Sequence, residues 1–436
     1  MFIFFYIFQY LILLLIVFYI IFMLYVKIKH NFWAIQPVYH SYDWYYWFRL
    51  PFVIQPNHCG KKYVNFTNTQ YYSLDALTEK DNEIVCDNFI KHIQRHYLRE
   101  KEASYIPNKT HILSHFKPGN SVFILYYLET VLVGSITSRQ VNAFINGEHY
   151  RTFYVDYLCV HNDYRKKGVA PELIETLSYY QRKYHKNVDV SLFKKESTAV
   201  SHWIKNLVSY NTYFYEIDKW DLTSYREPVV RNGTVLVHIT HENARLWLDF
   251  LRQEREKLIG DKRKNGRKNG SKIKCFIQSD DDVLLSQINK GVYMVYLLVQ
   301  NGTNIPVASY IFKDSGTKYK LSSGANTIGI EANTIGIEVQ SCFKIPECDD
   351  DTFVDGFYHA LYKIQKISEE IVRENKEKTT TPKYQMMLFE NISENNVIRN
   401  NFLFNRKFCC GKMPSTFYFY NYASKSVKPG EIIIIL

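Results

Sequence analysis

The sequence lacks the cysteine patterns that mark a disulfide framework or a zinc site. It contains eight cysteines, but no CxxC pair and no spacing typical of zinc ligands. The adjacent Cys409 and Cys410 are poorly placed to bridge each other. We therefore expect free thiols in a reducing compartment and no bound metal.

The sequence also lacks the low hydrophobicity of a disordered chain, because 46% of its residues are apolar and 16% are aromatic. Its 436 residues exceed the usual size of one domain and predict two lobes. Lysine and arginine outnumber aspartate and glutamate by 54 to 43, which gives a net charge of +11. This excess would attract phosphates, nucleic acid or an anionic membrane, but an AT-rich gene would produce the same abundance of lysine and asparagine.

No charged side chain occurs between Met1 and Val26, and Gln9 is the one strongly polar residue there. Because about 20 apolar residues suffice for a helix to cross the hydrocarbon core, we predict a transmembrane helix over residues 1–27. A cleaved signal peptide is the alternative. The segment has no basic start, its apolar run is too long for an h-region, and no small-residue cleavage site follows it.

The charges that follow this segment set its expected orientation. Lys27, Lys29 and His30 come after the span, so the positive-inside tendency puts the body of the chain in the cytosol. We expect a single-pass membrane protein with lipid as one partner. Six N-x-S/T sequons would accept glycans if the body were luminal; they begin at Asn65, Asn108, Asn232, Asn269, Asn301 and Asn391.

Hydrophobic periodicity predicts an α+β fold in which the first lobe begins with a helix near Leu74–Arg99. A hairpin is expected from the β-branched and aromatic runs Val122–Tyr127 and Thr130–Ile136. A third strand run, His149–Val160, leads through a basic turn into a helix from Val169 to about Lys186.

The second half of the sequence repeats this organisation. We expect helices at His241–Leu258 and Asp355–Asn375, and strands at Val292–Val299 and Pro306–Phe312. A polar connection around Ser224–Gly233 divides the body into lobes of residues 28–224 and 225–436. The predicted architecture is therefore two lobes, each a mixed sheet flanked by helices, after one transmembrane helix.

Two stretches are interpreted as insertions. Asp261–Lys274 reads DKRKNGRKNGSKIK, which is typical of a nucleic-acid or nuclear-targeting patch but also of a solvated loop. We favour the loop and expect no nucleic-acid partner. The heptapeptide ANTIGIE occurs twice in tandem, at Ala325–Glu331 and Ala332–Glu338. Two copies are too few for a solenoid, so a duplication within a loop or at a strand edge explains them.

The segment that carries most chemical information is Val155–Glu172, VDYLCVHNDYRKKGVAPE, where an apolar strand ends in a basic, glycine-containing turn that opens a helix. Unpaired amides at a helix start favour an anion, and Arg165, Lys166 and Lys167 add cations at the rim. Gly168 has no Cβ and lets the backbone approach a bulky phosphate. A solvated helix cap is the alternative interpretation.

The residues of this turn fit the R-x-x-G-x-A pattern of GNAT-type acetyltransferases, which hold the CoA pyrophosphate with it; they are Arg165, Lys166, Lys167, Gly168, Val169 and Ala170. The longer segment resembles the N-myristoyltransferase string NFLCVHKxLRSKRxxPxLI, which is followed in register by Asp156–His161 and then by Arg165, Lys167, Pro171, Leu173 and Ile174. Gly168 departs from that string, which has arginine there, and is closer to an ordinary GNAT turn.

A second match lies upstream. Phe32-Trp33-Ala34-Ile35-Gln36-Pro37-Val38 resembles the FWxTQPV element with which N-myristoyltransferases engage acyl-CoA. An aromatic anchor at the membrane interface is the alternative interpretation of Phe32 and Trp33. The two motifs occur in the order that the family has, and together they favour a divergent, eukaryotic-type glycylpeptide N-myristoyltransferase.

The resemblance implies two GNAT-like lobes, with myristoyl-CoA as acyl donor bound by the first and a peptide groove in the second. It implies that the backbone amides of Tyr157 and Leu158, at a strand bulge, hold the developing oxyanion. It also implies that the terminal carboxylate, here on Leu436 after an apolar tail, is the base for the attacking amine. A buried edge strand is the structural alternative for that tail.

The resemblance predicts transfer of a myristoyl group from CoA to the N-terminal glycine of a protein. One departure concerns the family's acidic YVEDDD run, which appears as Tyr97–Glu102 with cations among its carboxylates and puts peptide specificity in doubt. Two alternatives stay open: a GNAT-type N-acetyltransferase with another acceptor, and a degenerate membrane protein that binds acyl-CoA or lipidated protein without turnover.

Overall fold

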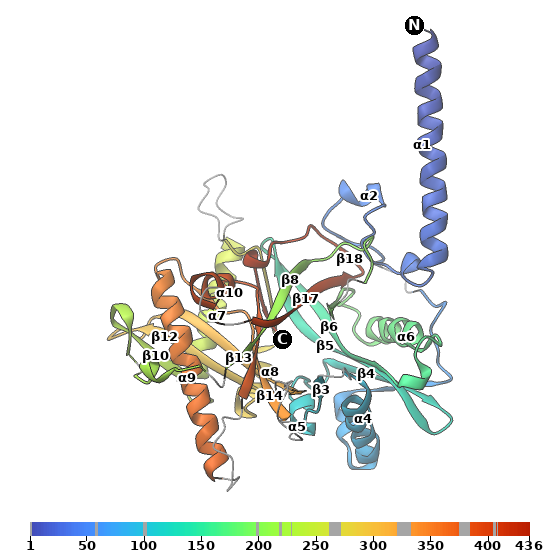
Figure 1. Cartoon of the computed structure of the whole chain (residues 1–436). Helices are drawn as coiled ribbons and strands as arrows, with labels where there is room; N and C mark the ends of the chain where they lie inside the picture. Colours follow the sequence, from blue (N-terminus) through green and yellow to red (C-terminus); the bar gives the residue numbers. More distant parts are fainter. Residues whose placement is uncertain are drawn as a thin grey trace, which may run out of the picture.

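The computed structural model describes most of the chain, and Figure 1 shows its arrangement. The described residues are 2–56, 60–98, 103–197, 200–217, 220–227, 229–260, 272–320, 333–374, 384–403, 407 and 409–436. Residues 261–271 of the basic stretch and residues 325–332 of the ANTIGIE repeat lie outside them.

The N-terminal helix α1 (Phe2–Lys29) projects from the body as a separate rod (Figure 1). Its segment Phe4–Lys29 has a mean hydropathy of 2.8, and only 6% of its most apolar window is buried against the rest of the chain. The predicted apolar helix is therefore confirmed. By length and composition it could cross a membrane, and a signal sequence would pass the same test.

The first lobe is built on a hairpin, a third strand and a helix, as predicted. Strands β4 (Ser121–Leu128), β5 (Val131–Ile145) and β6 (Glu148–Val160) are antiparallel neighbours, and helix α6 (Val169–Tyr184) connects β6 to the parallel strand β7 (Ser191–Glu196). The β5–β6 turn is Asn146-Gly147, with both φ values positive as a type I′ turn requires.

Helices cover both sides of this sheet, but the predicted helix Leu74–Arg99 is divided. It forms α3 (Leu74–Thr78) and α4 (Glu83–His96), because Lys80–Asn82 adopts a 3-10 turn between them. Ser73 caps α3 by accepting a hydrogen bond from the amide of Ala76. The remaining short elements here are η1 (Trp33–Ile35), α2 (Trp44–Trp47), β1 (Phe52–Val53), β2 (Thr69–Tyr72), β3 (Ala103–Tyr105) and α5 (Lys109–Leu113).

The sheet continues without interruption into the second half of the chain. From β7 the hydrogen-bonded order runs through β17 (Cys409–Tyr420), β8 (Val208–Glu216), β16 (Tyr384–Glu390), β14 (Asn333–Val339), β13 (Pro306–Lys320), β12 (Tyr293–Gln300) and β10 (Thr234–Ile239) to β9 (Val229–Val230). Its helices are α7 (Ala244–Gly260), α8 (Asp281–Asn289), α9 (Asp350–Glu374) and α10 (Asn395–Ile398).

Several strands pair across the two halves of the sequence. Strand β3 pairs with β13, and β17 lies between β7 and β8. Strand β11 (Cys275–Ser279) pairs with β5 on one side and with the C-terminal strand β19 (Ile432–Ile435) on the other. The chain therefore ends in the middle of the molecule, as Figure 1 shows.

Candidate active site

The strand β6 contains a bulge at Tyr157 and Leu158. Ser135 pairs with Cys159 and Thr137 with Asp156, so these two residues face Ile136 alone. Tyr157 has a φ of 50°, in the left-handed region that non-glycine residues seldom adopt. A bulge interrupts the strand ladder and redirects its amides. It lies at the two residues that the sequence resemblance named.

The carboxylate of Asp156 sits directly beside this bulge. It accepts hydrogen bonds from the Tyr157 amide at 2.8 Å and from the Tyr97 hydroxyl at 3.1 Å. Its other oxygen lies 3.4 Å from the guanidinium of Arg139, whose side chain is only 3% exposed. The resembling string has asparagine at this position, which could not form the Arg139–Asp156 ion pair seen here.

The terminal carboxylate of Leu436 is buried and held by two side chains. It accepts hydrogen bonds from the Tyr293 hydroxyl and from the Lys313 ammonium, the second at 3.2 Å. The parallel pairing of Ile432–Ile435 with β11 brings it there, and all of these residues are buried. The tail is therefore a buried edge strand whose carboxylate has a defined polar environment.

Lys313 connects the chain terminus with the bulge. Burial lowers the pKa of Lys313, while the carboxylates of Glu338 and Asp156 oppose that shift and Arg139 adds to it. In the β13–β14 ladder Lys313 is the direct partner of Glu338, so both side chains stand on one face of the sheet. Leu436, Lys313 and Asp156 consequently belong to one charged interior region.

A second group of charges adjoins this region around Lys194 on β7. Its ammonium lies 2.6 Å from Glu390, 2.8 Å from Glu196 and 3.8 Å from Glu338. Burial raises the pKa of Glu338 to about 7, with the charge of Glu390 acting in the same direction. Burial alone would lower the pKa of Lys194, but the surrounding carboxylates raise it well above its usual value.

The phosphate turn has the predicted backbone form. Gly168 precedes α6 with a φ of 88°, and Lys166 has a φ of 64°. Arg165 is exposed, and its guanidinium also donates to the carbonyls of Val160 at 3.1 Å and His96 at 2.9 Å. Lys166 and Lys167 remain exposed beside the helix start. The structure thus gives Arg165 a part in shaping the turn.

The Phe32–Val38 segment packs against the same helix. The Gln36 side chain donates to Glu175 of α6 at 3.3 Å and accepts from the Tyr420 hydroxyl at 2.6 Å. Trp33 stacks on Phe193 with ring centroids 6.0 Å apart, and Phe32 meets Tyr63 edge-on. The two predicted donor-binding motifs therefore both lie next to α6, and Trp33 of the upstream motif packs on Phe193 of β7.

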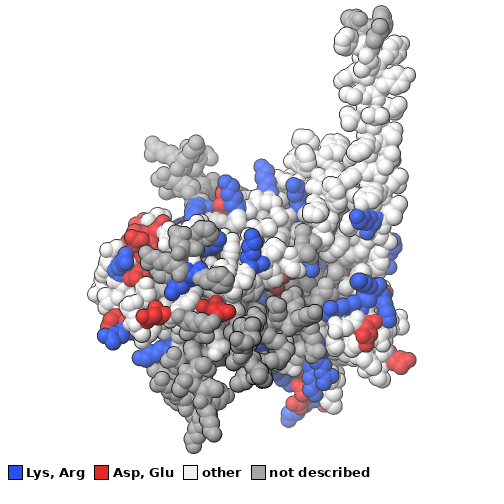
Figure 2. Space-filling model, in the orientation of Figure 1, with Lys and Arg blue, Asp and Glu red and all other residues white. Residues whose placement is uncertain are grey.

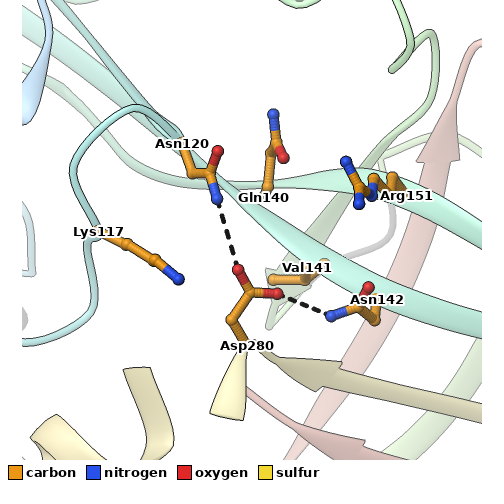
Figure 3. A pocket seen from close by; sticks show the side chains of 7 residues that line it. All are labelled: Lys117, Asn120, Gln140, Val141, Asn142, Arg151 and Asp280. Carbon is orange, nitrogen blue, oxygen red and sulfur yellow. Dashed lines mark hydrogen bonds between the residues drawn. The ribbon is translucent and has the colours of Figure 1, made fainter. Parts of the chain in front are cut away.

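A polar pocket of about 240 Å³ lies elsewhere, where β5 meets β11 (Figure 3). Its lining residues are Lys117, Asn120, Gln140, Val141, Asn142, Arg151 and Asp280. Asp280 accepts hydrogen bonds from Asn120 and Asn142, as the dashed lines in Figure 3 show. None of the residues named from the sequence lines it.

Histidine, cysteine and acidic side chains are dispersed in the described part of the chain, and the thiol beside the bulge is buried. No group of three or more histidine, cysteine or acidic side chains there could hold a metal ion. The seven cysteines within the described ranges are free thiols, and burial raises the pKa of Cys159, next to the bulge, to about 12. A thiolate nucleophile is therefore disfavoured at Cys159.

Comparison with known proteins agrees with this geometry. Residues 86–193 match the Acetyltransferase (GNAT) family. A structure of Saccharomyces cerevisiae N-myristoyltransferase with bound myristoyl-CoA superposes with a TM-score of 0.61 at 13% identity, over 92% of this chain and 94% of that one. The chain has the double GNAT fold of the N-myristoyltransferases.

Two further structures of the yeast N-myristoyltransferase support the same assignment. One with bound myristoyl-CoA and one with myristoyl-CoA and inhibitors each superpose with a TM-score of 0.62 at 12% identity over 92% of this chain, and cover 90% and 92% of those chains. A comparison with curated protein sequences gives no significant match. Residues 86–193 thus match a GNAT acetyltransferase module, and the chain as a whole has an N-myristoyltransferase-like fold.

The sequence analysis missed most charged residues of the interior. Lys313 and Glu338 each interrupt an apolar strand run, Ile311-Phe312-Lys313 and Ile337-Glu338-Val339, and Arg139 similarly lies within β5. A charge inside an otherwise apolar strand was the available signal, since such a residue is rarely buried without a partner. Tyr293 gave no comparable signal.

Proposed function

We propose that this chain transfers a myristoyl group from CoA to the N-terminal glycine of an acceptor protein, at the cytosolic face of a membrane. The observation that carries the proposal is the position of the chain terminus. A carboxylate that the fold brings into the interior, at the end of four buried isoleucines, is poorly explained by packing alone because a buried charge is costly.

The proposed reaction consumes only two substrates, the acyl-CoA and the protein with an N-terminal glycine. The glycine amine attacks the thioester carbonyl, so a C–N bond forms and the C–S bond breaks. The amides of Tyr157 and Leu158 stabilise the oxyanion, and the Leu436 carboxylate accepts the amine proton, which then passes to the departing CoA thiolate. Tyr293 and Lys313 hold that carboxylate in place.

The donor would lie across the region around α6. Exposed amides at the helix start, with Lys166 and Lys167, suit the pyrophosphate of CoA. Phe32 and Trp33, beside Phe193, offer an apolar wall for the start of a long chain. The structural neighbours were solved with myristoyl-CoA bound, which supports this donor over a short one.

A second candidate is binding of acyl-CoA without turnover. It is favoured by the hydrogen bond between the Tyr157 amide and Asp156, which occupies one of the two proposed oxyanion donors. For catalysis, the Asp156 carboxylate must turn away from this amide, and its contact with Arg139 offers the alternative partner. Turnover assays therefore separate the two candidates.

The membrane arrangement is part of the same proposal. Helix α1 would span the bilayer with Lys27 and Lys29 on the cytosolic side. The side-chain amide of the sequon residue Asn65 donates a hydrogen bond to Glu172 at 2.6 Å and so contributes to the fold. Asn301 is exposed and would be modified in a luminal body, so its glycan occupancy in cells tests the orientation. An unmodified Asn301 is expected.

Donor choice tests the enzyme assignment. Full-length protein in detergent would be titrated with non-hydrolysable myristoyl-CoA and acetyl-CoA analogues in parallel. We expect the myristoyl analogue to bind at least a hundredfold more tightly, because burial of each added methylene contributes about 0.8 kcal/mol. Equal affinities would instead favour an N-acetyltransferase.

A further inference from the structure

Four neighbouring aromatic side chains, in and next to α2, are unusually exposed. Trp44, Tyr45, Trp47 and Phe48, which we call the aromatic collar, are 63%, 50%, 59% and 81% exposed. Contiguous exposed apolar groups of this size mark surfaces that meet a partner. The collar contains no acidic residue, and the adjacent Arg49 lies 4.9 Å from the Tyr45 ring.

Tyr42, which precedes the collar by two residues, contacts α1 directly. The Tyr19 hydroxyl donates to the carbonyl of Tyr42 at 3.4 Å, just before α2. The Phe22 ring meets Tyr42 at 6.2 Å and Trp203 at 4.7 Å between centroids. Figure 1 shows α2 next to the lower part of α1, on the face of the body from which that helix leaves.

These contacts set the depth of the collar relative to a bilayer. The 28 residues of α1 span about 42 Å, whereas the hydrocarbon core is about 30 Å thick. If the span starts at the amino end, roughly the last eight residues emerge from the core, and the contact region Tyr19–Phe22 lies at its boundary. In Figure 2 the upper column of α1 is free of coloured charges, and lysines occur only near its base.

We propose that the aromatic collar inserts into the headgroup region of the bilayer that α1 spans, and so fixes the orientation of the catalytic body on the membrane. Tryptophan and tyrosine favour this depth because their rings are apolar and their N–H and O–H groups stay hydrated. Lys27, Lys29 and Arg49 lie where anionic headgroups would pair with them. The inference rests on the membrane placement of α1 in the proposed function.

Such an orientation has a consequence for donor access. The Phe32–Val38 segment follows α1 after only two residues, and the collar comes six residues later in the same connection. The proposed acyl wall at Phe32 and Trp33 would therefore face the membrane boundary, where long-chain acyl-CoA partitions. The test must distinguish lipid from two other occupants of the collar, a second copy of the chain and a different protein.

The test uses the full chain in nanodiscs that contain lipids brominated near the glycerol end, which quench tryptophan fluorescence at shallow depth. The variant Trp44→Phe/Trp47→Phe is compared with Trp220→Phe, which alters a tryptophan that packs against Tyr215 and Tyr358. We expect the quenched part of the fluorescence to fall at least twofold in the double variant and to stay unchanged in the control.

Alkaline carbonate extraction of the same protein from vesicles separates the outcomes. Resistance to extraction together with unquenched Trp44 and Trp47 would overturn the collar proposal and leave the anchor intact. Release by carbonate would overturn the anchor, and the collar proposal with it. Cross-linking through the collar between two copies in one nanodisc, without quenching, would assign this surface to self-association instead.

Discussion

The ammonium of Lys313 lies 3.2 Å from the terminal carboxylate of Leu436. Lys313 belongs to β13 and the bulge at Tyr157 to β6, so the cation that holds the proposed base and the proposed oxyanion donors come from opposite halves of one continuous sheet. Lys313, the cation that holds the Leu436 carboxylate, therefore lies on a strand outside both donor-binding motifs. Several measurable effects depend on this arrangement.

The terminal carboxylate can be removed without changing any side chain. Semisynthetic protein with a Leu436 carboxamide should lose at least a hundredfold in kcat, because general base catalysis contributes about that much or more. Donor affinity should change less than twofold. Leu436→Ala is the matched control, since it keeps a terminal carboxylate; comparable activity of the carboxamide would exclude Leu436 as the base.

Lys313→Met removes the cation bonded to that carboxylate. We expect kcat to fall about tenfold, and the acidic limb of the pH–kcat profile to move to higher pH, because a nearby cation favours the ionised carboxylate. Lys290→Met, at an exposed position, is the control. A fall in kcat with an unmoved acidic limb would mean that Lys313 acts only through packing.

Glu338 should make stability depend on pH. Its pKa is raised to about 7, mainly by burial. A carboxyl group that binds its proton more tightly in the native state stabilises the fold below its unfolded pKa of about 4.3, and this stability is lost as the pH rises through about 7. Relative to Glu338→Gln, the wild type should lose on the order of 3 kcal/mol across that window.

Unfolding of both proteins at several pH values would measure this difference. Glu196→Gln is a suitable comparison, because Glu196 contacts the same Lys194 at 2.8 Å but is 47% exposed. Parallel stability curves for the wild type and Glu338→Gln would contradict the assignment of a strongly shifted Glu338.

Asp156→Asn restores the residue that the resembling string has at this position. Arg139 would lose its carboxylate partner while buried, so the free energy of unfolding should fall by about 2 kcal/mol. The negative charge beside the oxyanion would also disappear, and kcat per folded molecule should rise several-fold. Asp163→Asn, whose side chain is 82% exposed, should change neither quantity. A lower kcat in Asp156→Asn would show that the carboxylate assists the reaction.

Much of the first lobe could be predicted because its contacts are local. The runs that form β4, β5 and β6 are separated by tight turns, and helix α6 follows at once, so periodicity of two and then 3.6 residues identifies them. The apolar α1 and the Gly168 turn are likewise defined by their own residues. The break between α3 and α4 was missed, because Glu79–Asn82 contains no proline or glycine that would indicate the end of a helix.

The interior site could be predicted only in part, because it is made by pairing between distant strands. Nothing local to Cys409–Tyr420 indicates that it lies between β7 and β8, or that β19 pairs with β11. The role of Leu436 was predicted through resemblance and stays a prediction, whereas the positions of Tyr293, Lys313 and Glu338 follow from strand registers that periodicity cannot give. The bonds from Arg165 to the carbonyls of Val160 and His96 likewise could not be predicted from its place in the turn.

The most direct test of the proposed function is CoA release by the full-length protein, with myristoyl-CoA and a glycine-initiated peptide. The same peptide with an acetylated amino terminus is the control, because it lacks the attacking amine. The account predicts CoA release and a myristoylated product with the free amine only. Tight myristoyl-CoA binding with no release above the acetylated control would contradict it and identify a lipid-binding protein instead.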